Sequence, residues 1–279
     1  MRYRMDLAYS GAGFFGWQLQ PGVPTVQEAL EKALTTLLRE PVRVTGAGRT
    51  DTGVNASRYT AHFDTSRILS CGAEVSGGAE ESCAQLRYKL NAILPKAVCI
   101  IEISPASDDF HARFGATLRQ YTYYLHRTKD PFLDDRSWFC AYPGLDFEAM
   151  NRAAACLEGT FDFSCFEKSG GDNKTSVCTV RRAFWEQYTP APAAYSGPAA
   201  EGIYWRFTIE ADRFLRNMVR AVVGTLIEVG RHRRSVEEFQ SLLLPPALAE
   251  CTPSKGPSRR SEAGESVPGH ALFLSGISY

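Results

Sequence analysis

The sequence lacks an excess of charge of either sign and lacks long hydrophobic runs. Its 279 residues include 31 Lys and Arg and 31 Asp and Glu, so the formal net charge at pH 7 is +0. This balance argues against a histone-like protein that binds nucleic acid through overall charge, because non-specific phosphate binding is electrostatic. A local basic surface would still be enough to bind RNA or DNA. No stretch approaches the roughly 18 apolar residues of a membrane span, so we expect no membrane contact.

Signals for secretion, disulfide frameworks and metal sites are also missing. Charges interrupt every short apolar run near the N-terminus, so no signal-peptide core is present. The eight cysteines include no C-x-x-C pair, which favours reduced thiols and a cytoplasmic protein. The five histidines form no H-x-x-x-H or His/Cys cluster. The sequence therefore gives no support for a metal site or a zinc-dependent hydrolase.

Two nucleotide-binding motifs are absent as well. No G-x-x-x-x-G-K-[ST] run occurs, which excludes a P-loop. The run that begins at Gly46 starts like G-x-G-x-x-G, but its sixth position is Asp51 instead of glycine. The sequence thus does not predict a dinucleotide-binding site there.

What is present is the composition of a folded protein with mixed secondary structure. Hydrophobic residues make up 44% of the chain, enough for a sizeable core. Alternating and 3.6-residue periodicities occur in both halves, so we predict an α+β fold of two similar halves, each a mostly antiparallel sheet covered by helices. The polar segment Ser104–Asp109 is the expected boundary between residues 1–104 and 105–279. We predict helices over the residues after Thr25 and over Gln85–Leu94, Phe147–Leu157, Phe214–Val229 and Val236–Leu244, and strands over Arg2–Tyr9, Val42–Thr45, Tyr59–Asp64, Val98–Ile103, Thr117–Arg127, Val180–Tyr188, Ile203–Glu210 and Ala271–Ser278.

A glycine-rich loop in the first half carries a candidate catalytic carboxylate. Asp51 lies two positions after Arg49 in the sequence GAGRTDTG. A neighbouring guanidinium favours the ionised carboxylate, and an ionised carboxylate can act as a nucleophile or a base. An Asp in such a loop also commonly forms an Asx-turn or a surface ion pair. The loop alone leaves both interpretations open.

Two further segments carry aromatic and basic residues. The run FHARF contains His111 and Arg113, and RQYTYY begins at Arg119 and contains Tyr121. Aromatic faces with interleaved guanidinium groups suit an extruded base and its phosphates, although alternating aromatics are also ordinary strand residues.

The third segment is an apolar helix that contains a charge. Arg220 lies on an otherwise apolar face and needs a partner, because an unpaired buried charge is costly. A structural Glu would serve, and so would Asp51. The segment Ile203–Arg234 carries seven arginines against three acidic residues, which predicts a local basic stripe.

Taken together and in order, these segments resemble the tRNA pseudouridine synthase A family. The resemblance runs from near residue 3 to residue 278. It rests on Gly16-Trp17-Gln18, GAGRTDTGV with AHFD after it, FHARF followed by RQYTYYLHR, FLRNMVRAVVG and AGESVPGHALF.

The resemblance implies an isomerase that converts uridine to pseudouridine at positions 38, 39 and 40 of the tRNA anticodon arm. Asp51 matches the catalytic aspartate, Tyr121 the tyrosine that stacks on the target base, and Arg220 the arginine that pairs with the aspartate. Arg49 matches the arginine that holds the nucleotide's place in the stack. We also expect RNA contacts from His111, Arg113 and Arg119. The family implies an active-site cleft between the halves, a cytoplasmic homodimer that binds one tRNA across both subunits, and no metal or organic cofactor.

Two positions depart from the family pattern, and two other functions stay open. Thr52 and Asn55 stand where the family loop usually has Ala and His, which puts local backbone contacts and RNA handling near Asn55 in question. One alternative is a catalytically silent RNA-binding protein. The other is a nucleoside N-glycosidase, which also needs a carboxylate near an anomeric carbon. The sequence does not decide whether Asp51 would attack C1′ or remove a C2′ proton.

Overall fold

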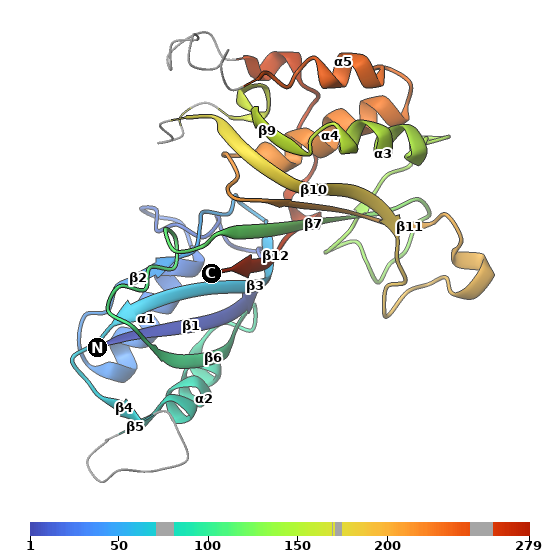
Figure 1. The fold of residues 1–279 in the computed structure, drawn as a ribbon. Coiled ribbons are helices and arrows are strands. Elements are labelled where there is room, and N and C mark those ends of the chain that lie inside the picture. The colour runs from blue at the N-terminus through green and yellow to red at the C-terminus, as the bar shows by residue number, and fades with distance from the viewer. Residues whose placement is uncertain (71–80, 169, 171–174, 246–258) are drawn as a thin grey trace. The chain divides into compact units, whose positions relative to one another are not determined.

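The chain folds into two compact units, shown in Figure 1. The computed structural model describes residues 1–70, 81–168, 170, 175–245 and 259–279. Unit 1 comprises Met1–Thr117 and Leu274–Tyr279, and unit 2 comprises Leu118–Phe273. The α+β class with mostly antiparallel sheet is confirmed. The division differs from the halves expected from the sequence, because the 104/105 boundary lies inside strand β6 (Val98–Ala106) and the C-terminal residues return to unit 1.

Unit 1 is built on a sheet in which β1 is central. β1 (Arg2–Tyr9) pairs antiparallel with both β3 (Asn55–Asp64) and β6. Its residues are alternately buried and half-buried, as the sequence alternation predicts. The sheet order is β6-β1-β3-β12, with β12 at Leu272–Ser278, and β2 (Val44–Gly46) also pairs with β3.

Two helices accompany this sheet, and their first turns are capped by side chains. α1 (Val26–Leu38) begins at Thr25, whose side-chain oxygen accepts from the Glu28 backbone N–H at 3.3 Å. α2 (Cys83–Ile93) begins with a complete capping box formed by Ser82 and Gln85. A short parallel pair, β4 (Leu69–Ser70) and β5 (Glu81–Ser82), precedes α2. The segment Cys71–Ser82 is rich in Gly, Ser and Glu, which predicts an exposed connection, but its residues 71–80 lie outside the described part.

One expectation about the cysteines is wrong. Cys83 is disulfide-bonded, so the thiols are not all reduced. The lack of a C-x-x-C pair says nothing about cysteines farther apart in the sequence. Burial raises the pKa of both Cys165 and Cys178 to about 12, which keeps these two thiols protonated and inert. The free cysteines among the described residues are Cys99, Cys140, Cys156, Cys165 and Cys178.

Unit 2 contains a run of neighbouring strands with helices on one side (Figure 1). Its strand order is β7-β11-β10-β9, and each of these neighbours is antiparallel. The strands are β7 (Leu118–His126), β8 (Trp138–Phe139, parallel to β7), β9 (Gly159–Asp162), β10 (Val177–Gln187) and β11 (Tyr204–Ala211). The helices are α3 (Phe147–Ala155), α4 (Met218–Gly230) and α5 (Val236–Gln240), with 3-10 turns at Ser164–Phe166, Gly197–Ala200, Arg259–Glu262 and Gly269–Ala271.

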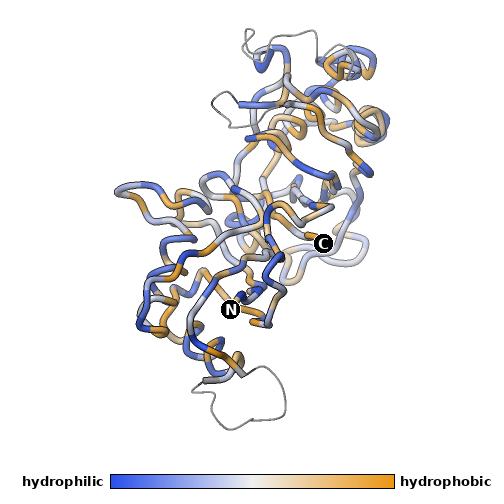
Figure 2. Tube along the Cα trace, turned by 60° about the vertical axis from the view of Figure 1, so that its left-hand side comes forward, coloured by the Kyte–Doolittle hydropathy of each residue, from blue (hydrophilic) through white to orange (hydrophobic). Residues whose placement is uncertain are grey.

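Polar and apolar stretches are interleaved along the part of the trace that is coloured by hydropathy (Figure 2). In the described part of the chain, no helix has the length and apolar content needed to cross a membrane. The apolar helix expected from Phe214 begins only at Met218, because Asn217 adopts a left-handed backbone with φ 64°. The helix expected to reach Leu244 ends at Gln240.

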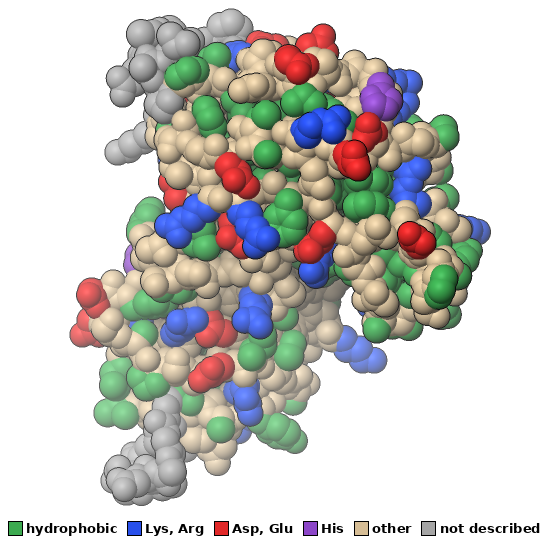
Figure 3. Space-filling model, turned by 45° about the vertical axis from the view of Figure 1, so that its right-hand side comes forward, with side chains coloured by type: hydrophobic (Ala, Val, Ile, Leu, Met, Phe, Trp, Pro, Cys, Tyr) green, Lys and Arg blue, Asp and Glu red, His purple; other side chains and the backbone are tan. Residues whose placement is uncertain are grey.

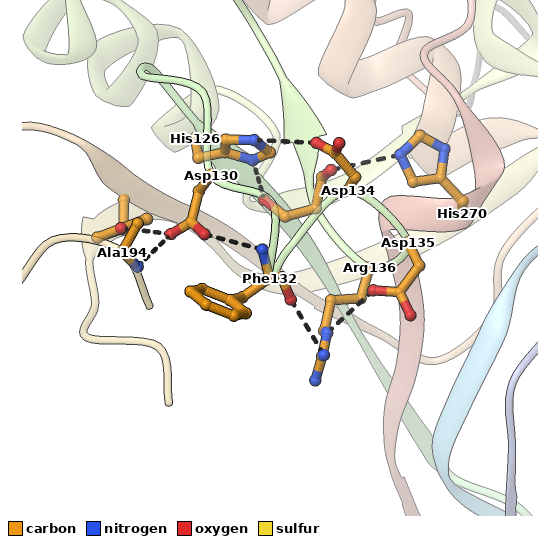
Figure 4. Close-up of polar contacts among 10 residues, drawn as sticks. His126, Asp130, Phe132, Asp134, Asp135, Arg136, Ala194 and His270 are labelled. Carbon is orange, nitrogen blue, oxygen red and sulfur yellow. Dashed lines mark hydrogen bonds and ion pairs between the residues drawn. The ribbon is translucent and has the colours of Figure 1, made fainter. Parts of the chain in front are cut away.

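The connection Pro190–Gly202 is rich in Pro, Ala and Gly, a composition that predicts mobility, but a buried carboxylate holds it. Figure 4 shows Asp130 accepting hydrogen bonds from the backbone of Phe132 at 3.0 Å and of Ala194 at 2.8 Å. The Tyr204 hydroxyl donates a third, at 2.7 Å. Burial opposes ionisation of Asp130, but these hydrogen bonds outweigh it and lower its pKa. The loop is therefore tied to unit 2 at Ala194.

Candidate active site

Asp51 lies in a tight turn between two paired strands. β2 and β3 are antiparallel, with Gly46 opposite Ala61, so the loop at residues 47–54 is short and closed at its base. The Val54 N–H donates to the Asp51 carbonyl at 3.1 Å, and Gly53 has φ 76°, which favours glycine. Asp51 is half-buried. The loop is ordered, as expected, and presents its carboxylate from a fixed backbone.

Aromatic side chains hold the first half of this loop. Trp17 and Tyr59 stack with ring centroids 4.1 Å apart. The Tyr59 hydroxyl donates to the Gly48 carbonyl and accepts from the Gly48 N–H. On the same side the Tyr9 hydroxyl lies 2.9 Å from Thr50 Oγ1. The loop is thus bonded to β3 through its backbone at Gly48 and to β1 through the Thr50 side chain.

Gly16 explains the motif Gly16-Trp17-Gln18 in physical terms. The Trp17 N–H donates to the Thr50 carbonyl at 3.2 Å. A Cβ on Gly16 would lie 2.4 Å from the same carbonyl oxygen, and its φ of 92° disfavours other residues. Only glycine lets this segment approach the residue that precedes Asp51.

The two departures from the family loop have different environments. Asn55 is 4% exposed, and its Oδ1 accepts from the Gly11 N–H at 2.8 Å. A Cβ on Gly11 would lie 2.4 Å from the Val54 carbonyl oxygen, so this contact is close. Asn55 therefore connects the end of the loop to the segment at Gly11 from a buried position, whereas Thr52 is exposed.

Arg49 is an exposed residue of the loop, and its side chain is oriented by a neighbour. Its Nε donates to Gln18 Oε1 at 2.7 Å. The sequence motif contained Gln18, but the spacing gave no sign that it contacts Arg49.

His111 and Arg113 lie in a turn whose backbone is capped by histidine rings. His111 Nδ1 accepts from the N–H groups of Arg113 and Phe114, each at 3.2 Å. His62 Nδ1 accepts from the Ala112 N–H at 3.2 Å. Burial, with the positive charge of Arg2, lowers the pKa of His62 to about 4. Phe114 is 78% exposed, and its ring centroid lies 4.5 Å from that of the His111 ring.

Tyr121 and Arg119 lie on β7 in unit 2. Tyr121 pairs with Ile209 of β11 and is 9% exposed. Its ring meets Phe214 edge-to-face at 5.0 Å, a favoured geometry for aromatic pairs. Arg119 Nη1 donates to the Asp212 carbonyl at 2.9 Å. Both side chains therefore have positions fixed by neighbours within unit 2.

Arg220 lies in the first turn of α4, against the segment Ala263–Pro268. Its Nε donates to the Val267 carbonyl at 2.7 Å, and the Val267 N–H donates to the Arg220 carbonyl at 3.2 Å. A Cβ on Gly224 would lie 1.7 Å from the Glu265 carbonyl oxygen. The first part of the closing motif AGESVPGHALF, Ala263–Pro268, thus packs along α4 and is called the brace below. The motif's sequence did not reveal this role.

The basic stripe expected over Ile203–Arg234 is not one continuous feature. Arg206 pairs with Glu186 at 2.8 Å, and Arg234 pairs with Glu228 at 3.0 Å. Lys and Arg are interspersed with Asp and Glu on the face in Figure 3. Counting charges along this segment missed Glu186, which lies on β10.

Unit 1 therefore holds Arg49, Asp51, His111 and Arg113, and unit 2 holds Arg119, Tyr121 and Arg220. The pairing of Arg220 with Asp51 stays a prediction. Among the described residues there is no cluster of three or more His, Cys, Asp or Glu that could hold a metal ion.

Comparison with known proteins places the chain in a class of RNA-modifying enzymes. A sequence model of the family described as tRNA pseudouridine synthase matches residues 153–279. The tRNA pseudouridine synthase A of Parabacteroides distasonis is 43% identical over 279 residues, covering 100% of this chain and 96% of the relative. Those of Porphyromonas gingivalis and Bifidobacterium longum are 41% and 39% identical, each covering 100% of this chain and 97% and 93% of the relative. The chain belongs to the tRNA pseudouridine synthase A family.

Proposed function

We propose that this chain converts uridines of tRNA to pseudouridine. The observation that carries the proposal is full-length similarity to relatives named tRNA pseudouridine synthase A, at 43% identity for one of them. The sequence motifs further support positions 38, 39 and 40 of the anticodon arm as the targets.

The reaction moves the glycosidic bond of uridine from one atom of the base to another. The N1–C1′ bond breaks, the uracil turns, and a C5–C1′ bond forms while C5 loses its proton and N1 gains one. Asp51 supplies the carboxylate that starts this sequence, at C1′ or at the C2′ proton. Its closed, multiply bonded loop supports this role, because a carboxylate held in place has little orientational freedom to lose in the transition state.

The remaining roles come from motif positions and are consistent with the local chemistry. Tyr121 stacks on the uracil and limits its escape once it is detached. Arg220 pairs with the Asp51 carboxylate and favours its ionised form. Arg49 occupies the position that the extruded base leaves, and extrusion costs a few kcal/mol that backbone contacts can offset. We propose RNA contacts by His111, Arg113 and Arg119.

The assembly and location follow from the same resemblance. We propose a homodimer in which one tRNA contacts both subunits, acting in the cytoplasm. The chain's own residues supply all the catalytic groups named above.

The substitution Asp51→Asn tests the chemistry directly. Asn has nearly the same shape as Asp but cannot act as a nucleophile or base. We expect tRNA binding to be retained and tritium release from 5-tritiated uridine in tRNA to fall by at least about 10³-fold. Thr52→Ala, a change at the exposed neighbour, should leave the release nearly unchanged. Substantial release by Asp51→Asn would contradict the assigned role.

The same assay separates the alternatives. A nucleoside N-glycosidase would liberate free uracil, which chromatography detects. A silent RNA-binding protein would bind tRNA with no tritium release by the wild type.

A further inference from the structure

A hollow of about 190 Å³ opens in unit 1 beside the Asp51 loop. Residues far apart in the sequence line it. They come from the Gly16-Trp17-Gln18 motif, the first turn of α1, strand β2 with the glycine loop, and the FHARF turn. Arg49 and Arg113 both contribute to its wall. The hollow therefore brings together Arg49 of the GAGRTDTG loop and Arg113 of the FHARF turn. The sequence predicted an RNA contact for each of them independently.

The charge of the lining favours an anion. Among the described residues that line the hollow, Arg49 and Arg113 are charged and none is Asp or Glu. The lining residue Gln27 does contact a carboxylate, that of Glu31, at 2.9 Å. Glu31 is neutralised by Arg43 at 3.1 Å and accepts from the Val44 N–H at 3.0 Å. The described lining itself thus carries two positive charges and no negative one.

Part of the wall of the hollow is closely packed. One face of the Trp17 ring is stacked on Tyr59. A Cβ on Gly46 would lie 2.2 Å from the Tyr59 hydroxyl and 2.5 Å from the Trp17 ring, so the backbone is packed directly on both rings. Gln18 holds the guanidinium of Arg49 through its Nε. Preorganised donors bind an anion at a low entropic cost.

The size and surface of the hollow favour a phosphate group. Its volume is below the roughly 300–1,000 Å³ of sites that enclose a whole small molecule. Since Tyr59 already covers one face of Trp17, a base has less ring surface on which to stack. Guanidinium groups bind phosphate well. A single phosphate group of an RNA backbone could enter the hollow while the rest of the RNA strand stays outside it.

We propose that this hollow binds one backbone phosphate of the RNA substrate, with Arg113 supplying charge and Gln18 acting as a positioning residue that holds Arg49 at the rim. The identity of the ligand as RNA rests on the proposed function. Because Arg49 is two residues from Asp51, the phosphate belongs to a nucleotide close to the target uridine.

The first test measures tRNA binding by Arg113→Gln as a function of salt. The matched control is Arg87→Gln, which removes one charge from α2 of the same unit, outside the lining; Arg87 donates to the Ile101 carbonyl. We expect Arg113→Gln to weaken binding roughly tenfold and to reduce the slope of log K against log salt by about 0.7–0.9. KM should rise with little change in kcat. Equal slopes and equal KM for the two variants would overturn the proposal.

The second test uses two substitutions of Gln18. Gln18→Met removes the acceptor for Arg49, whereas Gln18→Glu keeps an acceptor but places a negative charge at the hollow. If a phosphate binds there, Gln18→Glu weakens tRNA binding more than Gln18→Met does, by several-fold, although it still holds Arg49. Binding by Gln18→Glu as tight as that of the wild type would contradict a phosphate in the hollow.

The third test locates the phosphate. Anticodon stem-loop RNAs with a single neutral methylphosphonate linkage are bound to the wild type and to Arg113→Gln. At one linkage the wild type should lose affinity and Arg113→Gln should lose nothing further, which is the signature of a coupled pair. Additive losses at every linkage would refute the hollow as the phosphate site. Tritium release by the wild type is scored separately, so a failed hollow and a failed isomerase function give different results.

Discussion

The two units hold their candidate site residues in different ways. In unit 1, Asp51 lies on a loop without regular structure, which Tyr59 holds through the Gly48 backbone and Tyr9 through the Thr50 side chain. In unit 2, Tyr121 lies in a strand ladder, and Arg220 lies in a helix braced by Ala263–Pro268. A loop can move without unfolding the sheet beneath it, whereas the brace packs on a helix that is buried along most of its length. We therefore expect disruption of the brace to affect folding first, and disruption of the loop to affect turnover first.

The largest effect is expected from Gly224→Ala in α4. Alanine is ordinarily the better helix former, so intrinsic propensity alone predicts stabilisation. Here the new Cβ would lie 1.7 Å from the Glu265 carbonyl oxygen, and either the brace or the helix must shift. We expect a loss of about 3 kcal/mol or more in the free energy of unfolding, measured by denaturant titration.

Gly230→Ala in the same helix is the matched control. Its Cβ would meet the Met150 sulfur at 2.4 Å, and a flexible Met side chain adapts more readily than a backbone carbonyl does. The loss should be clearly smaller than for Gly224→Ala. If both variants lost the same free energy of unfolding, the contact between Gly224 and the brace would not be the cause of the loss.

The next effect concerns the loop of unit 1. Gly16→Ala combines a positive φ with a Cβ 2.4 Å from the Thr50 carbonyl oxygen, whereas Gly13→Ala has a similar φ of 81° and open space. Both variants should lose about 1–2 kcal/mol of stability from backbone strain. Only Gly16→Ala should displace the residues around Asp51, lowering the rate of tritium release at least about tenfold. Equal activity in the two variants would show that the loop position does not depend on Gly16.

The sequence was more informative about elements than about contacts. Periodicity located β1 and most helices because burial of one face is a local property of the pattern. It missed the start of α4, which depends on the left-handed backbone of Asn217. It identified Asp51 as a candidate and Asn55 as a departure from the family loop, but it did not show that Tyr59 holds Gly48 or that Asn55 accepts from Gly11. Such partners are set by strand register, which no single motif contains.

The smallest effect compares a buried histidine from each unit. Burial lowers the pKa of both His62 and His126, so each takes up a proton more readily in the unfolded chain. Stability should therefore fall as pH drops below about 6.5, the usual His pKa. For His62, whose pKa is about 4, the loss between about pH 7 and about pH 5.5 amounts to about 1 kcal/mol.

The two histidines differ in what protonation breaks. His62 Nδ1 accepts from the Ala112 backbone N–H, so a proton there removes the acceptor that anchors the turn carrying Arg113. His126 Nδ1 lies 2.9 Å from the Ser137 hydroxyl, which can accept as well as donate, and its Nε2 lies 3.9 Å from Asp134. Acid should thus weaken tRNA binding through His62.

The substitution His62→Asn keeps an acceptor at that position and does not titrate. It should therefore flatten the fall in both stability and tRNA affinity as the pH drops, measured by denaturant and binding titrations across this pH range. His232→Asn, at an exposed histidine, should leave both curves unchanged. If stability and tRNA affinity depend on pH in His62→Asn as they do in the wild type, His62 is not the source of the acid sensitivity. The buried histidines of the two units would then not differ in their effect on tRNA binding.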